Sequence, residues 1–421
     1  MDHPQALVGE ESGHVARAET QQLPLACAAT AAPEPAAPGH DRDRPASFGL
    51  TATGTVTVLR RAAAALGRPF LELRNKLEAF ELFQQAPRLL RQRERRFWHF
   101  DLRQASRPGA GNTPLAQQVA SAQALFPLHL APWVIEGLGY HHGEAAWRRG
   151  ADPRELLRGD LPPGSLIALH AGLGLSLAGR ALARVSARSA PDLAALSTGF
   201  MALCREVSRP GYAEITFEAL GFIARMRGRR LVPLLDRELA RLDPALGELF
   251  WHGAGRALYM LPYNVLPGGA AACRALRMAL AEPARPAGRR NAVAGVAWAL
   301  TLINLRHPEL LAACLENQSA ALAEGGSFAD GVASALLAWH DLAPADPYLE
   351  AFHRFQPAAG DCPLGLLWRR QVAGTGVAAR VGMPADSAPH AASAAGPDQL
   401  FRCPPLGGHR TPGDNINTRK R

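Results

Sequence analysis

The segment Ile135-Glu136-Gly137-Leu138-Gly139-Tyr140 is the first copy of a repeat, because a similar segment follows later in the chain as Phe217-Glu218-Ala219-Leu220-Gly221-Phe222. A second stretch, His170-Ala171-Gly172-Leu173-Gly174, returns as His252-Gly253-Ala254-Gly255, with the histidine shifted by one position relative to the glycine pair. Weaker copies follow at residues 294–298 and 330–333. Recurrence at a period of about 80 residues indicates a pair of structural elements repeated three times.

The periodicity inside these stretches is helical. Apolar residues recur at three- and four-residue spacing, as in Val56-Leu59-Ala63-Leu66 and Leu231-Leu235-Leu239-Leu242, and no alternating strand pattern accompanies them. Glycine inside a helix costs about 0.5–1 kcal/mol relative to alanine, so its repeated use predicts helix backbones in close contact. The fold we expect is an all-α repeat domain over residues 55–371, built from three helix-pair units.

The two ends of the chain have a different composition. Residues 1–54 are rich in Ala, Pro, Gly and charge, and residues 372–421 are similar and finish in a basic stretch. Neither segment carries enough apolar surface to offset the entropy of ordering it. Both are therefore predicted to be disordered tails.

Composition and charge bear on whether the chain is a metal-binding, secreted or membrane-spanning protein. The net charge of +9 is almost entirely arginine, since Lys76 and Lys420 are the only lysines, and with so much alanine this is typical of a GC-rich genome. The six cysteines are scattered, without the spacing of a zinc site, and predict reduced thiols in a cytoplasmic protein. We expect no secretory signal, because residues 1–39 lack a basic start followed by an apolar core. We expect no membrane span either, because the apolar stretch at residues 161–185 is interrupted by His170 and Arg180.

An arginine-rich run at residues 88–103 contains Phe97, Trp98 and Phe100. Such a mixture binds nucleic acid or lies on an anionic membrane surface in some proteins, and in others it is a solvated helix with an aromatic docking edge. No recognised nucleic-acid motif accompanies the run, so we do not expect a nucleic-acid partner. Peripheral contact with a membrane stays open.

Charged residues inside the apolar repeats are candidates for a site. Glu136 and Glu218 occupy equivalent positions, and a buried carboxylate either pairs with an arginine or keeps a raised pKa and acts as a general acid or base. Histidines and an arginine in the neighbouring stretches join them if the repeats close around one axis. The candidate catalytic residues are Glu136, Glu218, His170, His252 and Arg256.

Aromatic and histidine side chains next to these positions are candidates for contacting a ligand: Tyr140, His141, Trp251, Tyr259 and Trp298. No metal site is predicted, because the chain lacks ExxH spacing and the adjacent His141 and His142 cannot face one direction on a helix. No cofactor is predicted either, since the glycine pairs lack the third glycine of a dinucleotide site and no GxxxxGK[ST] occurs.

The order of these stretches resembles a bacterial family of unknown function whose genes lie beside those for enediyne polyketide biosynthesis. The resemblance covers about residues 56–345, and its most specific part is Gly253-Ala254-Gly255-Arg256-Ala257-Leu258-Tyr259. Looser matches lie at residues 135–139, 170–174, 219–222, 295–299 and 328–332. The resemblance implies an accessory role in polyketide or other specialised-metabolite synthesis, and it supplies no catalytic residues.

These observations lead us to expect an accessory protein that binds a hydrophobic intermediate or a biosynthetic partner protein. One alternative is an acid/base enzyme, of the cyclase or isomerase kind, with a hydrophobic substrate in an internal pocket. A second alternative is a helical scaffold at an anionic surface. An enzyme predicts a pocket where Glu136 and Glu218 meet a histidine, whereas a scaffold predicts glutamates held by structural arginines and an exposed apolar patch.

Overall fold

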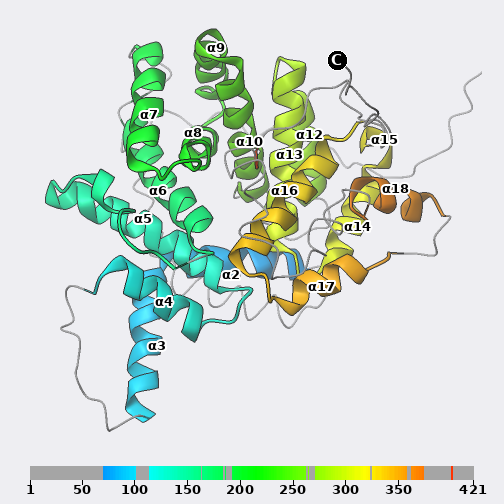
Figure 1. The fold of residues 1–421 in the computed structure, drawn as a ribbon. Helices are drawn as coiled ribbons and strands as arrows, with labels where there is room; N and C mark the ends of the chain where they lie inside the picture. The colour runs from blue at the N-terminus through cyan, green and yellow to red at the C-terminus, as the bar shows by residue number, and fades with distance from the viewer. Residues whose placement is uncertain are drawn as a thin grey trace, which may run out of the picture. The chain divides into compact units, whose positions relative to one another are not determined.

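The computed structural model describes residues 70–100, 113–162, 164–183, 185, 192–261, 264, 271–322, 325–357, 362–373 and 400–401, all within the unit formed by residues 51–421. These residues form sixteen α-helices, one 3-10 helix and no strand, which confirms the all-α prediction (Figure 1). The helices are α2 (Leu71–Gln84), α3 (Ala86–Phe100), α4 (Leu115–Leu125), α5 (Ala131–Arg149), η2 (Pro153–Glu155), α6 (Leu166–Ala181), α7 (Leu193–Val207), α8 (Ala213–Arg227), α9 (Val232–Leu242), α10 (Pro244–Met260), α12 (Ala271–Ala281), α13 (Pro286–Ile303), α14 (Pro308–Asn317), α15 (Ser319–Leu322), α16 (Ser327–Leu342), α17 (Pro347–Arg354) and α18 (Pro363–Gln371).

Helix boundaries follow local sequence. The side chains of Asp192, Asp243 and Asp346 each accept a hydrogen bond from a backbone N–H in the first turn of the helix that follows. Proline occupies the first turn of α5, α9, α10, α13, α14, α17 and α18, where its missing N–H costs nothing. Helix α5 ends at Gly150, whose φ of 65° is the left-handed conformation that favours glycine.

Six helices form the central row of the domain. Helices α5, α6, α8, α10, α13 and α16 pack in that order, each most extensively on its neighbours in the row (Figure 1). Helices α4, α7, α9 and α12 pack against these central helices. Helices α6, α10 and α13, which have the most buried residues, lie inside the row.

Glycines allow the row to pack closely, as the sequence predicted. A Cβ atom on Gly172 of α6 would lie 1.9 Å from the carbonyl oxygen of Glu136, and one on Gly253 of α10 would lie 2.0 Å from that of Glu218. A Cβ on Gly295 of α13 would meet the carbonyl oxygen of His252 at 2.0 Å. These glycines thus lie against the backbone of three residues that the sequence marked as candidates for a site.

Helix α2 links α5, at one end of the row, to the carboxyl end of α13. It packs on α5, and its polar side chains reach residues more than 200 positions away, at the carboxyl end of α13. Asn75 Nδ2 donates to Asn304 Oδ1 at 3.1 Å, and Arg306 Nη2 donates to Glu78 Oε2 at 2.5 Å. The buried Lys76 ammonium donates to the carbonyl oxygen of a residue between α10 and α12. These polar contacts tie the first described helix to the later half of the domain.

Several predictions concern segments that the structure describes little or not at all. The predicted tail at residues 1–54 and the side chains from residue 94 to 100 of the arginine-rich run lie outside the described part of the chain. Within the predicted tail at residues 372–421, the structure describes residues 372–373 and 400–401, and the Phe401 side chain is only 2% exposed. Of the helices in the described ranges, none combines the length and apolarity needed to cross a bilayer.

Candidate functional site

Five of the sequence-predicted residues meet in the interior of the helix row. Glu136 comes from α5, Glu218 from α8, His252 and Arg256 from successive turns of α10, and Trp298 from α13. Side chains four positions apart lie on the same face of a helix, which is why His252 and Arg256 both reach Glu218. All five side chains are buried or nearly so, and we refer to them as the interior cluster.

Glu218 and His252 form a hydrogen-bonded pair. The carboxylate is fully buried, and its Oε1 atom lies 2.9 Å from Nδ1 of His252. Burial lowers the pKa of His252, and the nearby Glu218 offsets this only in part, so the imidazole is neutral near pH 7. A neutral ring that donates from Nδ1 carries a lone pair on Nε2. That Nε2 atom is buried and has no hydrogen-bond partner among the described residues.

Arg256 connects the two carboxylates. Its Nη1 atom donates to Glu218 Oε2 at 2.7 Å, and its Nη2 atom lies 3.6 Å from Glu136 Oε1. Burial alone would raise the pKa of Glu218, but Arg256 and His252 together bring it below its ordinary value. For Glu136, burial outweighs the attraction of Arg256, and the pKa is raised. The pKa values of the two carboxyl groups that contact Arg256 are thus shifted in opposite directions. Such a separation of pKa values is typical of acid/base pairs.

The aromatic rings of Trp298 and Phe401 pack against members of the interior cluster. The Arg256 guanidinium lies 4.3 Å from the centre of the Trp298 ring, a cation–π contact. Nε1 of Trp298 is also buried without a hydrogen-bond partner in the described ranges. We call this atom and His252 Nε2 the open nitrogens. The Phe401 ring packs against both residues, with its centre 4.6 Å from the imidazole and 5.8 Å from the indole.

His170, a predicted catalytic residue, does not join the interior cluster. Its Nδ1 atom donates to the carbonyl oxygen of Leu166 at 2.7 Å, and its Nε2 atom accepts from the backbone N–H of Arg209 at 3.1 Å. Its ring stacks on Tyr212, and burial lowers its pKa to about 4. Both nitrogens are used in holding the backbone, so the role of His170 in this structure is structural.

The remaining predicted ligand-binding residues are held by partners of their own. The Tyr140 ring packs on Phe83 at 5.2 Å, while His141 lies 2.8 Å from the carbonyl oxygen of Gln84. Trp251 donates its indole N–H to Asp236 at 2.7 Å. These contacts fasten α5 to α2 and α10 to α9.

Tyr259 lies in a separate buried polar group at the carboxyl end of α10. Its hydroxyl accepts a hydrogen bond from Asn304 Nδ2 at 2.8 Å, and the Lys76 ammonium lies 3.5 Å from the centre of its ring. Burial is the main cause that lowers the pKa of Lys76, and the nearby carboxylate of Glu72 opposes it. The ring of Tyr259 therefore stabilises a buried cation that ties α2 to α10.

Sequence reasoning missed Phe401. It lies in the segment predicted to be a disordered tail, and neither its spacing nor its neighbours distinguish it from other residues there. Only the packing of its ring on His252 and Trp298 identifies it as part of the candidate site.

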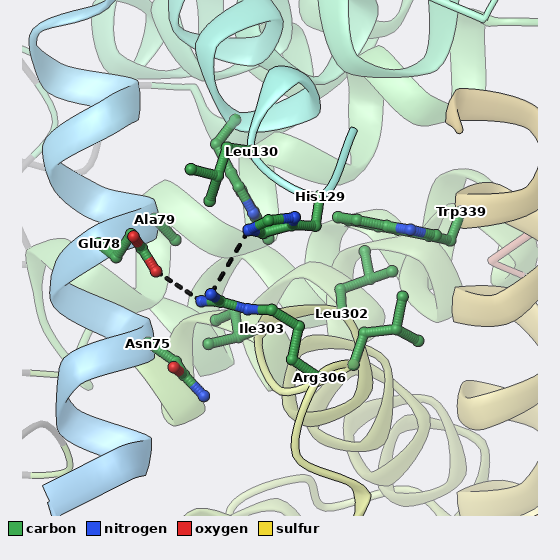
Figure 2. A pocket seen from close by; sticks show the side chains of 11 residues that line it. Asn75, Glu78, Ala79, His129, Leu130, Leu302, Ile303, Arg306 and Trp339 are labelled. Carbon is green, nitrogen blue, oxygen red and sulfur yellow. Dashed lines mark hydrogen bonds and ion pairs between the residues drawn. The ribbon is translucent and has the colours of Figure 1, made fainter. Parts of the chain in front are cut away.

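A small pocket lies elsewhere in the domain (Figure 2). It has a volume of about 10 Å³, room for about one water molecule, and shares no lining residue with the interior cluster. Arg306 donates to Glu78 and lies 3.4 Å from Nε2 of His129, and Asn75 contributes a buried amide oxygen that no described group bonds. A water molecule at this position would satisfy that oxygen, so the pocket is part of the α2 contact.

Comparison with known proteins adds no functional information: no family model, no curated protein and no solved structure matches this chain. Within the ranges that the structure describes, no three His, Cys, Asp or Glu side chains are grouped as metal ligands. The interior cluster is thus the strongest candidate site, and its chemistry is that of two carboxylates, one imidazole and one guanidinium beside aromatic rings.

Proposed function

We propose that this chain binds a hydrophobic small molecule at the interior cluster. The observation that carries the proposal is the pair of open nitrogens, His252 Nε2 and Trp298 Nε1, both buried next to an aromatic ring. A buried polar atom without a partner costs about 1–3 kcal/mol, a cost that a bound ligand removes by supplying the missing hydrogen bond.

One feature of the interior cluster is also expected of a scaffold: both glutamates are paired with an arginine, Arg256. An ion pair with a purely structural role, however, gives no reason for an imidazole nitrogen and an indole N–H to be buried beside it without partners. Nor do apolar side chains on the surface favour a scaffold. The exposed large apolar residues of the described chain lie in three separate places, the connection between α4 and α5, the end of α9, and α18: Leu128, Leu242 and Leu366.

A second candidate function is acid/base catalysis on the bound molecule. The hydrogen bond from His252 Nδ1 to Glu218 favours it, because this contact orients the imidazole and stabilises the imidazolium that forms when Nε2 takes a proton. Of the two carboxyl groups, Glu136 is the better suited to donate a proton, because burial raises its pKa whereas the pKa of Glu218 is lowered. The reaction class would be a proton transfer on a hydrophobic substrate, as in an isomerase or cyclase.

The wider setting rests on the sequence alone. We infer an accessory role in polyketide-like metabolism in the cytoplasm from the resemblance, with a biosynthetic protein as a further partner. The division of the helix row into three units of about 80 residues is likewise part of this proposal. The recurrent glycine contacts between successive central helices support it.

Native mass spectrometry of the full chain purified from its own host tests the proposal. We expect an apolar molecule at stoichiometric level that is lost in Trp298→Phe and retained in Trp251→Phe. The second variant is the matched control, because the Trp251 indole N–H donates to Asp236. Retention of the molecule by both variants would place it elsewhere in the chain. A chain free of small molecules that instead co-purifies with a synthase subunit would overturn the proposal.

A further inference from the structure

We propose that Phe401 is an internal plug, and that the ligand displacing it carries a hydroxylated aromatic ring. This inference rests on the proposed function, because it concerns the same interior cluster. It adds two elements, the chemical class of the ligand and the residue that occupies the site without it.

The Phe401 ring occupies an interior position against residues of two central helices. It is 2% exposed, and it packs at an interplanar angle of 34° on His252 and at 75° on Trp298. These contacts are well within the range of favourable aromatic pairs. An aromatic ring is therefore a group that this position accepts.

The ring of Phe401 leaves the polar part of the site unsatisfied. A phenyl group has no atom that can donate to His252 Nε2 or accept from Trp298 Nε1–H, so both stay open nitrogens while it is in place. A ring hydroxyl does both, because its O–H donates and its oxygen accepts. A phenol-like ring thus replaces the apolar contacts of Phe401 and adds the hydrogen bonds that Phe401 cannot make.

Among the described residues, one hydrogen bond holds the segment that carries the plug. The carbonyl oxygen of Leu400 accepts a hydrogen bond from the hydroxyl of Ser334 on α16. Leu400 itself is only half-buried. Because ring replaces ring, the apolar surface that Phe401 loses on leaving is regained by the ligand. The additional hydrogen bonds then favour the exchange.

Phe401→Ala in the full chain tests the inference, with phenol and toluene as probes and calorimetry or NMR titration as the measurement. We expect the variant to bind phenol about tenfold more tightly than toluene, the ratio that one additional good hydrogen bond provides. Wild-type chain should bind phenol at least about tenfold more weakly than the variant does, because Phe401 competes for the position.

Phe328→Ala is the matched control. Phe328 is a phenylalanine of α16 with 1% exposure, and its replacement also creates a ring-sized cavity. There we expect toluene to bind at least as well as phenol. Adding Trp298→Phe to Phe401→Ala should reduce the preference for phenol, since one open nitrogen is removed. If the alanine variant does not fold, the wild-type chain is titrated with both probes, and we expect the same preference for phenol at the weaker affinity.

Equal binding of phenol and toluene to the Phe401 variants, or a phenol preference that survives the added Trp298→Phe, would overturn the inference. These outcomes are separate from those for the proposed function. One outcome is that a host-derived ligand depends on Trp298 but the Phe401 variants bind phenol and toluene equally. That result contradicts the plug and the ligand class and leaves the proposed function in place. A clear phenol preference in a chain without a host-derived ligand leaves the plug standing and removes the proposed function.

Discussion

At the scale of single residues, two buried histidines show how different roles arise from similar sequence. His170 and His252 both lie within two residues of a glycine in apolar helices, and both are almost completely buried. The backbone uses both nitrogens of His170, whereas His252 gives one nitrogen to Glu218 and keeps the other as an open nitrogen. His170 consequently stabilises the fold as a neutral ring, and His252 is the residue with free bonding capacity.

The pH dependence of stability should report the role of His170. Its pKa is about 4 in the folded chain against an ordinary value of 6.5, so the unfolded chain binds the additional proton first. The stabilising contribution is fully present above about pH 6.5 and is lost as pH falls toward 4, amounting to about 3 kcal/mol. His170→Gln should therefore flatten the fall in the free energy of unfolding between pH 7 and pH 4.5, measured by urea titration.

Tyr212→Phe is the control for this measurement, because it keeps the ring stacked on His170 and leaves the histidine in place. We expect it to retain the wild-type slope. An unchanged slope in His170→Gln would mean that other buried groups carry the acid sensitivity of the fold.

At the scale of elements, the helix crossings and the candidate site depend on each other. Gly172, Gly253 and Gly295 lie against the carbonyl groups of Glu136, Glu218 and His252, so each close crossing also positions a side chain of the interior cluster. Backbone contact of this kind requires the absence of a side chain on one helix, and it fixes the distance between the two axes. A change at a crossing is therefore expected to move the site as well as the helices.

Two glycine-to-alanine substitutions in α6 distinguish the effect of the close helix crossing from the effect of helix propensity. Gly172→Ala places a Cβ 1.9 Å from a backbone oxygen and should lower the free energy of unfolding by about 2 kcal/mol or more. Gly179→Ala has no neighbour within 4 Å and should raise it by about 0.5–1 kcal/mol, because alanine is the better helix former. Chemical denaturation of both variants measures the difference. Similar effects from the two would show that α6 does not depend on this crossing.

At the scale of the whole described unit, long-range polar contacts complement the apolar helix row. Neighbouring helices of the row are close in sequence, but α2 binds residues at the end of α13 through Asn75–Asn304 and Glu78–Arg306. The carboxylate and guanidinium of the second pair are only 11% and 19% exposed. Partial burial reduces solvent screening, so this pair should contribute more than a surface ion pair.

A double-mutant cycle on Glu78→Gln and Arg306→Met measures that contribution. We expect a coupling energy of about 1–3 kcal/mol in the free energy of unfolding. The control cycle uses Glu350 and Arg354, which pair on the surface of α17 with more than two thirds of each side chain exposed, and no measurable coupling is expected there. Additive effects at Glu78 and Arg306 would mean that this ion pair does not help to hold α2 in place.

The local pattern of the sequence determined the helical class and the close glycine packing. Spacing of apolar residues is a property of each segment, so Leu231 to Leu242 predicted a helix that the structure places at α9. Glycine is unfavourable in a helix interior unless something offsets its cost, and the close approach of another backbone does so at Gly172 and Gly253, as their repeated pattern predicted. The equivalent positions of Glu136 and Glu218 likewise singled out both carboxylates of the interior cluster.

Which of the candidate residues share one site depends on long-range packing. Whether His170 or His252 has a free nitrogen depends on atoms contributed by Arg209 and Glu218, which the flanking sequence does not specify. The contact of Arg256 with Glu136 joins α10 to α5 across more than a hundred residues. Phe401 had no local pattern at all, because its place against His252 arises from long-range packing. Periodicity in the sequence shows which residues lie on one face of a helix, whereas a site depends on how several helices are placed relative to one another.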